Sequence, residues 1–341
     1  MSATEQPAGL VQEEQSSLRR RPAGSLLWLL PLLAAVVLLP QVAGAYGARV
    51  GGTVLMFLAL AQSWNLIGGY VGLMSLAHSA FYGLGAIGAT ILLINGVPLF
   101  VAAGGGVLLA MVAALLIGAP TLRLQGHYFV IATLLVNEAL LNGVRNLNAF
   151  GFHGAISQNI INEVGLAHLS AEAYNAVFYY AMAVLAGLSM AIVWLFERSR
   201  WGLALKAIRD AEGAAAAIGI SVAGVKLGIF VVSAALAAMV GVTSAAWLGT
   251  VDTTAAFDIT LTFQIIVMVF LGGRGTLWGP VVGALLIVPV ETYLRSTLSG
   301  LWPGSHLVVL GLVLVAAALF MKRGIVGTWR SLRERMGRNG R

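Results

Sequence analysis

Long apolar stretches separated by short polar connections run along almost the whole chain. A helix needs about 20 apolar residues to cross the hydrocarbon core of a bilayer. A window of that length predicts ten membrane-spanning helices. They cover residues 26–44, 50–68, 73–94, 97–119, 126–145, 174–196, 226–249, 258–273, 277–297 and 303–321.

The positions of Lys and Arg orient these helices. With the N-terminus placed inside, Arg49, Arg145 and Arg295 fall outside, and the rest of the 20 Lys and Arg residues fall inside. Cytoplasmic connections carry such an excess of basic residues. Removing one helix would put either the charged segment 198–226 or the tail 322–341 on the wrong side. The chain therefore predicts an all-α polytopic membrane protein with both termini in the cytoplasm.

Composition excludes several classes of protein. The chain is 59% hydrophobic and 10% charged, whereas a soluble domain carries about 25% charged residues. The net charge of +7 comes from basic clusters that flank apolar stretches, which is typical of membrane anchoring and not of nucleic-acid binding. Because the chain has no Cys, disulfides and Cys-based metal sites are excluded, and we expect no bound metal.

The polar segments divide the chain into parts. A transmembrane domain, 26–321, is flanked by a polar cytoplasmic arm, 1–25, and a basic cytoplasmic tail, 322–341. Segment 146–173 is too polar to span and is predicted to be an external loop, either a connector or a surface for an external partner. The first apolar run resembles a cleavable signal peptide, but the charge alternation favours an uncleaved first helix.

The charged segment 198–226 lies between two bilayer-length stretches. Its composition predicts one amphipathic helix from Leu203 to Ile218, with Gly219 in the position that ends a helix. This helix is either a solvated loop or a docking element through which a soluble partner moves the membrane part. The residues that would carry docking are Lys206, Arg209, Asp210, Glu212, Ala215 and Gly219.

Polar side chains inside the bilayer are costly and are candidates for function. On the third predicted helix, Ser75, His78, Ser79 and Tyr82 would share one face. On the fifth, polar residues cluster near Arg145. Such groups either form interhelical hydrogen bonds, worth about 0.6 kcal/mol each, or line a polar passage. The residues considered for a passage are Ser75, His78, Tyr82, Asn137, Glu138 and Asn142.

Glycine is frequent, and several glycines are four residues apart, as in helices that pack closely in lipid. These candidates for helix packing are Gly68, Gly72, Gly275, Gly279 and Gly283. The sequence GLGAIG at 83–88 matches a dinucleotide-binding pattern, but it lies in a predicted membrane helix without the required strand. A Walker A motif, HExxH and GxSxG are all absent, so we expect no enzymatic activity from this chain.

Four stretches resemble a known family in the expected order. They are NLIGGYVGLMSLAHSAFYGLGA at 65–86, LRLQGHYFVIATL at 122–134, SRWGLALKAIRDAEGAAAAIGI at 199–220 and LGGRGTLWGP at 271–280. These stretches are similar to the LivM-type permease subunits of branched-chain amino-acid ABC importers. The third looks like the cytoplasmic coupling segment of that family.

The resemblance implies a multi-pass permease in the bacterial cytoplasmic (inner) membrane that works by alternating access. Its expected partners are a second homologous permease subunit, two cytoplasmic ATP-binding subunits and a periplasmic or extracellular solute-binding protein. ATP and Mg²⁺ would be bound by the partner subunits, with no cofactor on this chain. The cargo would be branched-chain or related amino acids. Urea, an amide or another small solute is an alternative, as is a self-sufficient secondary transporter.

Overall fold

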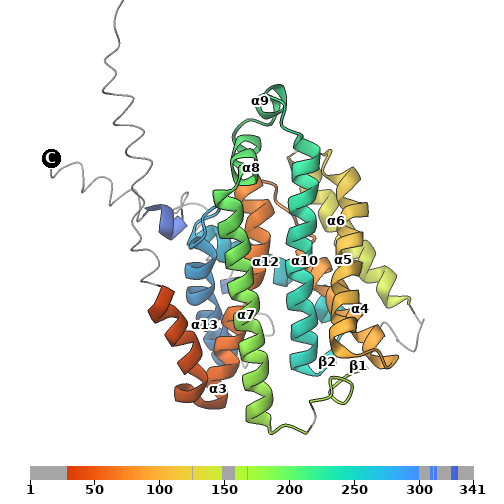
Figure 1. Cartoon of the computed structure of the whole chain (residues 1–341), viewed down its shortest axis with the longest axis vertical. Coiled ribbons are helices and arrows are strands. Elements are labelled where there is room, and N and C mark those ends of the chain that lie inside the picture. The colour runs from red at the N-terminus through yellow and green to blue at the C-terminus, as the bar shows by residue number, and fades with distance from the viewer. Residues whose placement is uncertain are drawn as a thin grey trace, which may run out of the picture.

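The computed structural model describes residues 29–124, 126–147, 158–166, 168–298, 308–309, 311–312 and 324–328. The predicted arm 1–25 and most of the tenth predicted helix and the basic tail lie outside these ranges. Within them the chain is a bundle of helices with one short pair of strands (Figure 1). The helices are α3 (Leu29–Trp64), the π-helix η1 (Asn65–Val71), α4 (His78–Ile94), α5 (Leu99–Thr121), α6 (His127–Arg145), α7 (Ala171–Arg198), α8 (Arg200–Asp210), α9 (Glu212–Ala217), α10 (Val222–Leu248), α11 (Thr253–Ala256), α12 (Ile259–Gly272) and α13 (Gly279–Leu298). The strands are β1 (Gln158–Asn159) and β2 (Thr250–Val251), which pair antiparallel.

Six helical segments in the described ranges are long and apolar enough to cross a membrane. They are Tyr46–Val71, Leu99–Thr121, His127–Arg145, Ala171–Arg198, Val222–Leu248 and Thr253–Gly272. Each coincides with a predicted span, and the all-α polytopic class is confirmed. The described residues neither establish ten spanning helices nor place the two termini.

The first two predicted spans are separated at the expected place, because α3 is broken at Gly44, where the backbone leaves helical geometry (φ 63°, ψ −167°). One predicted boundary is wrong. The helix of the third predicted span, 73–94, begins five residues later than predicted. Residues 72–77 are not helical, and α4 starts at His78. Irregular backbone at membrane depth is tolerated where protein buries it, and Ser75, Leu76 and Ala77 are all buried.

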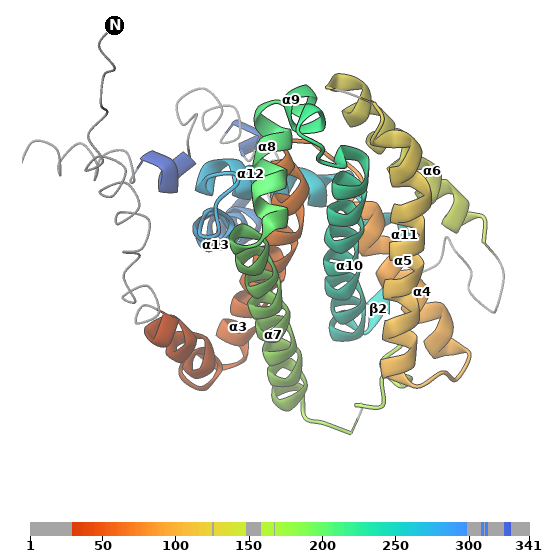
Figure 2. The same cartoon turned by 45° about the horizontal axis from the view of Figure 1, so that its top comes forward.

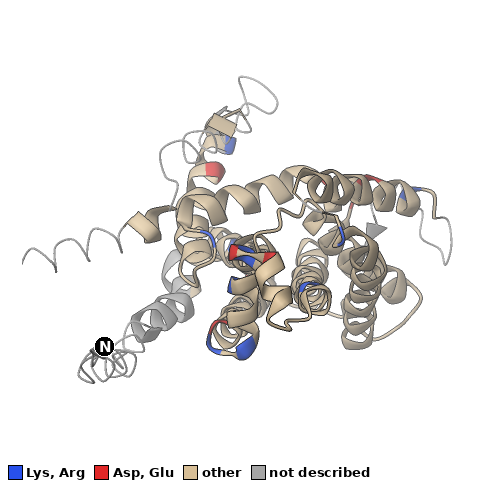
Figure 3. Cartoon of the chain, turned by 90° about the horizontal axis from the view of Figure 1, so that it is seen from above, with Lys and Arg blue, Asp and Glu red and all other residues tan. Residues whose placement is uncertain are grey.

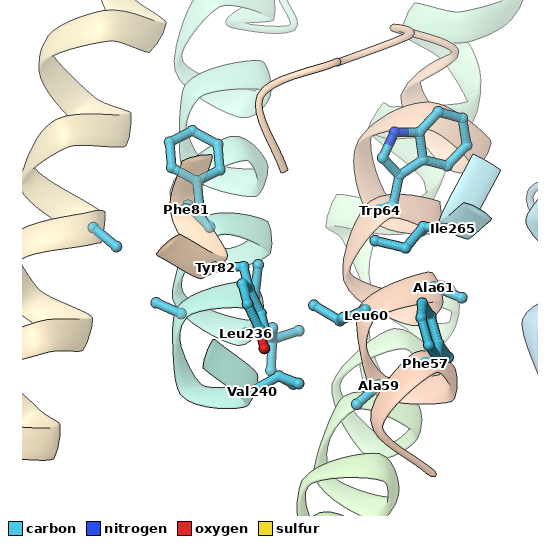
Figure 4. Packing of buried hydrophobic residues seen from close by; sticks show 14 of the residues in the cluster. Phe57, Ala59, Leu60, Ala61, Trp64, Phe81, Tyr82, Leu236, Val240 and Ile265 are labelled. Atoms are coloured by element: carbon cyan, nitrogen blue, oxygen red, sulfur yellow. The ribbon is translucent and has the colours of Figure 1, made fainter. Parts of the chain in front are cut away.

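The central helices are α3, α4 and α10, and their apolar side chains form the core. Leu60 of α3 points toward the side of the bundle where Tyr82 of α4 and Leu236 of α10 lie (Figure 4). Helices α5 and α6 lie at the edge of the bundle (Figure 2). Phe100 and Leu116 of α5 are 89% and 69% exposed, as expected for a surface that faces lipid or another membrane subunit.

Glycines set the closest approaches between helices. A Cβ at Gly283 of α13 would overlap the Met268 carbonyl of α12, and one at Gly85 of α4 would overlap the Ala238 backbone of α10. Gly85 belongs to the dinucleotide-like sequence, which therefore packs against a helix. Gly72 and Gly275 do not form helix seams as predicted, because both lie outside helices with positive φ angles of 86° and 69°.

Candidate functional site

The charged segment lies at one end of the bundle, and the β1–β2 pair lies at the other (Figure 1). Segment 198–226 contains two short helices, α8 and α9. Ser199 caps α8 by accepting a hydrogen bond from the Gly202 backbone N–H. The prediction of one continuous helix is wrong, because Ala211 is extended (φ −158°, ψ 92°) and separates the two. Gly219 follows α9 with φ 88°, so its predicted role as the helix terminator is confirmed.

Arg209, in the last turn of α8, lies against the membrane bundle. Its Nη1 is 3.5 Å from the Gly69 carbonyl oxygen of η1. A Cβ at Gly72 would be 3.0 Å from its Cγ, and a Cβ at Gly275 would be 3.0 Å from its Nη1. The absence of side chains at these glycines therefore gives the arginine room. The neighbouring Asp210 is 70% exposed and is 3.2 Å from Arg209 Nε.

Glu212, the first residue of α9, forms an ion pair inside the chain. Its Oε1 lies 2.6 Å from Nζ of Lys226, whose side chain is only 2% exposed. From the sequence, Glu212 is predicted to contact a partner, but its carboxylate is already engaged with Lys226 of α10. Ala215 is likewise buried within the chain, at 2% exposure.

Three large apolar side chains of segment 198–226 are exposed. Trp201, Leu203 and Ile218 are 52%, 69% and 76% exposed, and sequence reasoning overlooked all three as contact residues. Lys206 is half-buried. Viewed toward this end, the bundle displays few charged residues, and they gather largely at helix ends (Figure 3). Exposed large apolar side chains beside charges are typical of a protein–protein contact surface.

Deeper in the bundle, polar side chains of four helices form hydrogen bonds. His78 Nε2, at the start of α4, is 2.7 Å from Ser233 Oγ of α10. Ser79 donates to Asn137 Oδ1 of α6 at 3.0 Å, and Thr262 Oγ1 of α12 donates to Ser79 Oγ at 3.1 Å. All five side chains are fully buried. The arrangement holds α4 at the centre of the bundle.

Ser75 belongs to the buried connection that precedes α4. Its carbonyl oxygen accepts a hydrogen bond of 2.8 Å from Trp64 Nε1, and the next residue's backbone N–H donates to Thr133 Oγ1 at 3.0 Å. The predicted helical face with His78 is wrong, because Ser75 is not in the helix. Tyr82 is buried in α4, near the middle of the core (Figure 4).

Glu138 and Asn142 do not join this buried group. Both are exposed on α6, whereas their neighbour Asn137 points inward and donates to the Phe257 carbonyl at 3.1 Å. Arg145, two turns from Glu138, donates instead to Thr254 Oγ1 at 2.9 Å. The polar residues predicted for a passage therefore divide into an inner group and an outward-facing pair.

Two further polar clusters escaped the sequence analysis. Asn65 accepts a 2.8 Å hydrogen bond from the Gly275 N–H and donates to the Thr276 carbonyl at 3.0 Å, which fixes the connection between α12 and α13. Gln264 of α12 donates to Glu291 of α13 at 2.5 Å. The sequence signal that could have identified both clusters is a polar residue within an otherwise apolar run. Within the described ranges no group of three or more His, Cys, Asp or Glu could hold a metal ion.

At the opposite end, part of the predicted external loop folds onto the bundle. Strand β1 pairs with β2, and Ile160 N–H donates to the Gly249 carbonyl at 2.8 Å. Trp247 Nε1 of α10 donates to Asn175 Oδ1 of α7 at 3.0 Å. These contacts join α7 and α10 at their ends. Residues 148–157 of this loop lie outside the described ranges.

Comparisons with known proteins give a consistent result. The high-affinity branched-chain amino acid transport system permease protein LivM of Escherichia coli (strain K12) is 28% identical over 299 residues, which cover 79% of this chain and 68% of that protein. A probable branched-chain amino acid transport permease protein LivM of Methanocaldococcus jannaschii is 29% identical over 196 residues, 55% of each chain. The fructose import permease protein FrcC of Rhizobium meliloti is 28% identical over 147 residues, 42% of this chain and 40% of that protein. No solved structure shows a significant match.

A family model extends over most of the helical bundle. It is described as branched-chain amino acid transport system, permease component, and it matches residues 46–318. The match begins just after the break at Gly44 and includes the buried polar group, α8, α9 and the connection held by Asn65. The chain therefore belongs to the family of permease components of branched-chain amino acid transport systems.

Proposed function

We propose that this chain is the membrane-spanning permease subunit of an ATP-driven importer in the bacterial inner membrane. The observation that carries the proposal is that three large apolar side chains of segment 198–226 are exposed, namely Trp201, Leu203 and Ile218. The charges of segment 198–226 require water around it, and apolar side chains that face water favour a soluble partner. Without a nucleotide-binding motif of its own, the chain would depend on two partner subunits that bind ATP and Mg²⁺.

The outward face of α6 supports a second permease subunit. Glu138 lies in the interior of a bilayer-length helix and is exposed, and an ionisable side chain in contact with lipid is strongly disfavoured. Ala139 and Gly143 on the same face are also exposed, and such small residues let a second helix approach closely. We place the passage between two homologous permeases, with Glu138 and Asn142 on its wall. That wall would gain further polar residues only when α4 moves during alternating access. They are Ser75, His78, Tyr82 and Asn137.

The β1–β2 end would face an external solute-binding protein. Asn162 and Glu163 are exposed there, while Ile160 and Val164 anchor the same turn in the core. A rigidly held polar turn is suited to recognition by another protein. The cargo we propose is a branched-chain or related small amino acid, as the names of the LivM relatives suggest. The match to a fructose permease makes a sugar the second cargo to test.

The experiment is purification of the chain from its native membrane in a mild detergent, followed by mass spectrometry. The proposal predicts recovery of an ATP-binding subunit and a second permease. The control is the Ile218→Asp variant, which keeps the membrane part intact and should lose the ATP-binding subunit selectively. Recovery of this chain alone, active in liposomes without ATP, would contradict the proposal and identify a secondary transporter.

A further inference from the structure

The two short helices make different side-chain contacts with the membrane bundle, although α8 also packs against α10. Helix α8 is attached through Arg209, which lies on Gly69 and Gly72 at the end of the first long span and beside Gly275 in the connection between α12 and α13. These two regions are themselves joined by the hydrogen bonds of Asn65. Arg209 therefore contacts one continuous unit, made of α3, η1 and the α12–α13 connection.

Helix α9 is attached through Glu212 to Lys226 of α10. The lysine side chain is almost completely buried, and removing one partner from a buried ion pair leaves an uncompensated charge. Two turns further along α10, Ser233 lies 2.7 Å from His78 at the start of α4. The attachment of α9 thus leads through α10 to α4.

Only Ala211 separates the two helices. It is the single residue between α8 and α9, and its extended backbone interrupts the helical hydrogen bonding. A change of angle at this residue would alter the direction of α9 relative to α8. Because Glu212 contacts α10 and Arg209 contacts η1 and the α12–α13 connection, that change would act on α10 and on the α3 side through different side chains.

We propose that Arg209 and Glu212 are positioning residues that attach the coupling segment separately to the α3 side and to the α10 side of the bundle. In this inference, which rests on the proposed function, movement of the ATP-binding partners changes the angle at Ala211. The ion pair between Glu212 and Lys226 then pulls α10, and with it α4, away from α3. The Glu212 carboxylate acts inside this chain and does not bind the partner.

The test uses the full transporter complex in proteoliposomes and measures cargo taken up per ATP hydrolysed. Glu212→Gln combined with Lys226→Met removes the ion pair without leaving a buried charge. The exchange of Glu212→Lys with Lys226→Glu restores a pair of opposite charges. Arg209→Ala removes the other attachment, and Arg200→Ala is the matched control, because Arg200 is exposed on the same helix and makes no described ion pair.

The double variant Glu212→Gln/Lys226→Met, here called the neutral pair, and Arg209→Ala should each lower the uptake per ATP about tenfold. A change of this size lies within the usual range of coupling between sites. Each should keep the bound ATP-binding subunits, and Arg200→Ala should change nothing. The variant with exchanged charges, Glu212→Lys with Lys226→Glu, should recover at least part of the wild-type uptake per ATP. If the neutral pair does not fold, uptake per ATP in Arg209→Ala is the test, because removing the Arg209 side chain leaves no buried charge.

Wild-type uptake per ATP in either the neutral pair or Arg209→Ala would overturn the inference while leaving the importer proposal intact. Loss of the ATP-binding subunits from the neutral pair, with a thermal stability equal to wild type, would also overturn it, because Glu212 would then be a partner contact. If the wild-type chain transports without ATP, the inference falls together with the proposed function.

Discussion

His78 Nε2 lies 2.7 Å from Ser233 Oγ, and this hydrogen bond joins the first turn of α4 to the middle of α10. Both side chains are fully buried, so neither can exchange its partner for water. His78 Nδ1 has no hydrogen-bond partner among the described residues. Ser233 and the edge-on ring of Phe81, with centroids 6.1 Å apart, both contact the imidazole.

Ser233→Ala should lower the free energy of unfolding by about 1–3 kcal/mol, since it leaves a buried ring nitrogen without a partner. The measurement is thermal unfolding of the purified chain in detergent. Ser189→Ala is the matched control: Ser189 is equally buried on α7, but its hydroxyl donates to the Ala186 carbonyl of its own helix. Equal stability losses in the two variants would contradict a specific role for the bond between α4 and α10.

Gly283→Ala should separate α12 from α13, because the added Cβ would overlap the Met268 carbonyl. Overpacking of this kind costs about 1–3 kcal/mol. The yield of monodisperse protein and its melting temperature measure the effect. Gly187→Ala in α7 is the control, since no atom lies within 4 Å of the added Cβ. If Gly283→Ala melts at the wild-type temperature, the close approach of these helices is wrong.

Ile218→Asp should weaken the binding of the ATP-binding subunit without destabilising this chain. The side chain is 76% exposed, so the charge enters water and disrupts only an apolar contact with a partner. Quantitative co-purification measures the loss, and His168→Asp, an exposed change elsewhere in the chain, is the control. Undiminished co-purification would remove Ile218 from the docking surface.

Glu138→Leu should reduce cargo uptake by the complex while the chain itself remains as stable as wild type. Glu138 is exposed on α6 and has no described ion pair, so an apolar residue of similar size costs the single chain nothing. The exposed Val184 on α7 provides the control variant Val184→Ala, which should transport normally because it lies on another helix. Wild-type uptake by Glu138→Leu would show that this face contacts lipid and not a passage.

Most of the helical segments could be predicted from the sequence, because the bilayer imposes a minimum apolar length. The predicted spans 97–119, 126–145 and 226–249 differ by only a few residues from α5, α6 and α10. The segment before α4 could not be predicted in this way. Leu73 to Ala77 are compatible with a helix by composition, and their non-helical backbone is stabilised by Trp64 and Thr133, which are distant in sequence.

The candidate site could be located but not resolved from the sequence. The end of α9 at Gly219 was predicted correctly, because helix termination is a local property. The pairing of Glu212 with Lys226 could not be read from spacing, since it requires α9 to fold back against α10. For the same reason the inward direction of Asn137 and the outward direction of Glu138, adjacent on one helix, became clear only from the packing of α6.

The most direct measurement is uptake of radiolabelled leucine by proteoliposomes that contain this chain, its second permease and the ATP-binding subunits, with the binding protein outside and ATP inside. Fructose and urea are measured in parallel. The account predicts leucine uptake that requires ATP hydrolysis and the binding protein and is absent with either other solute. Uptake without ATP, or of fructose or urea in preference to leucine, would contradict it.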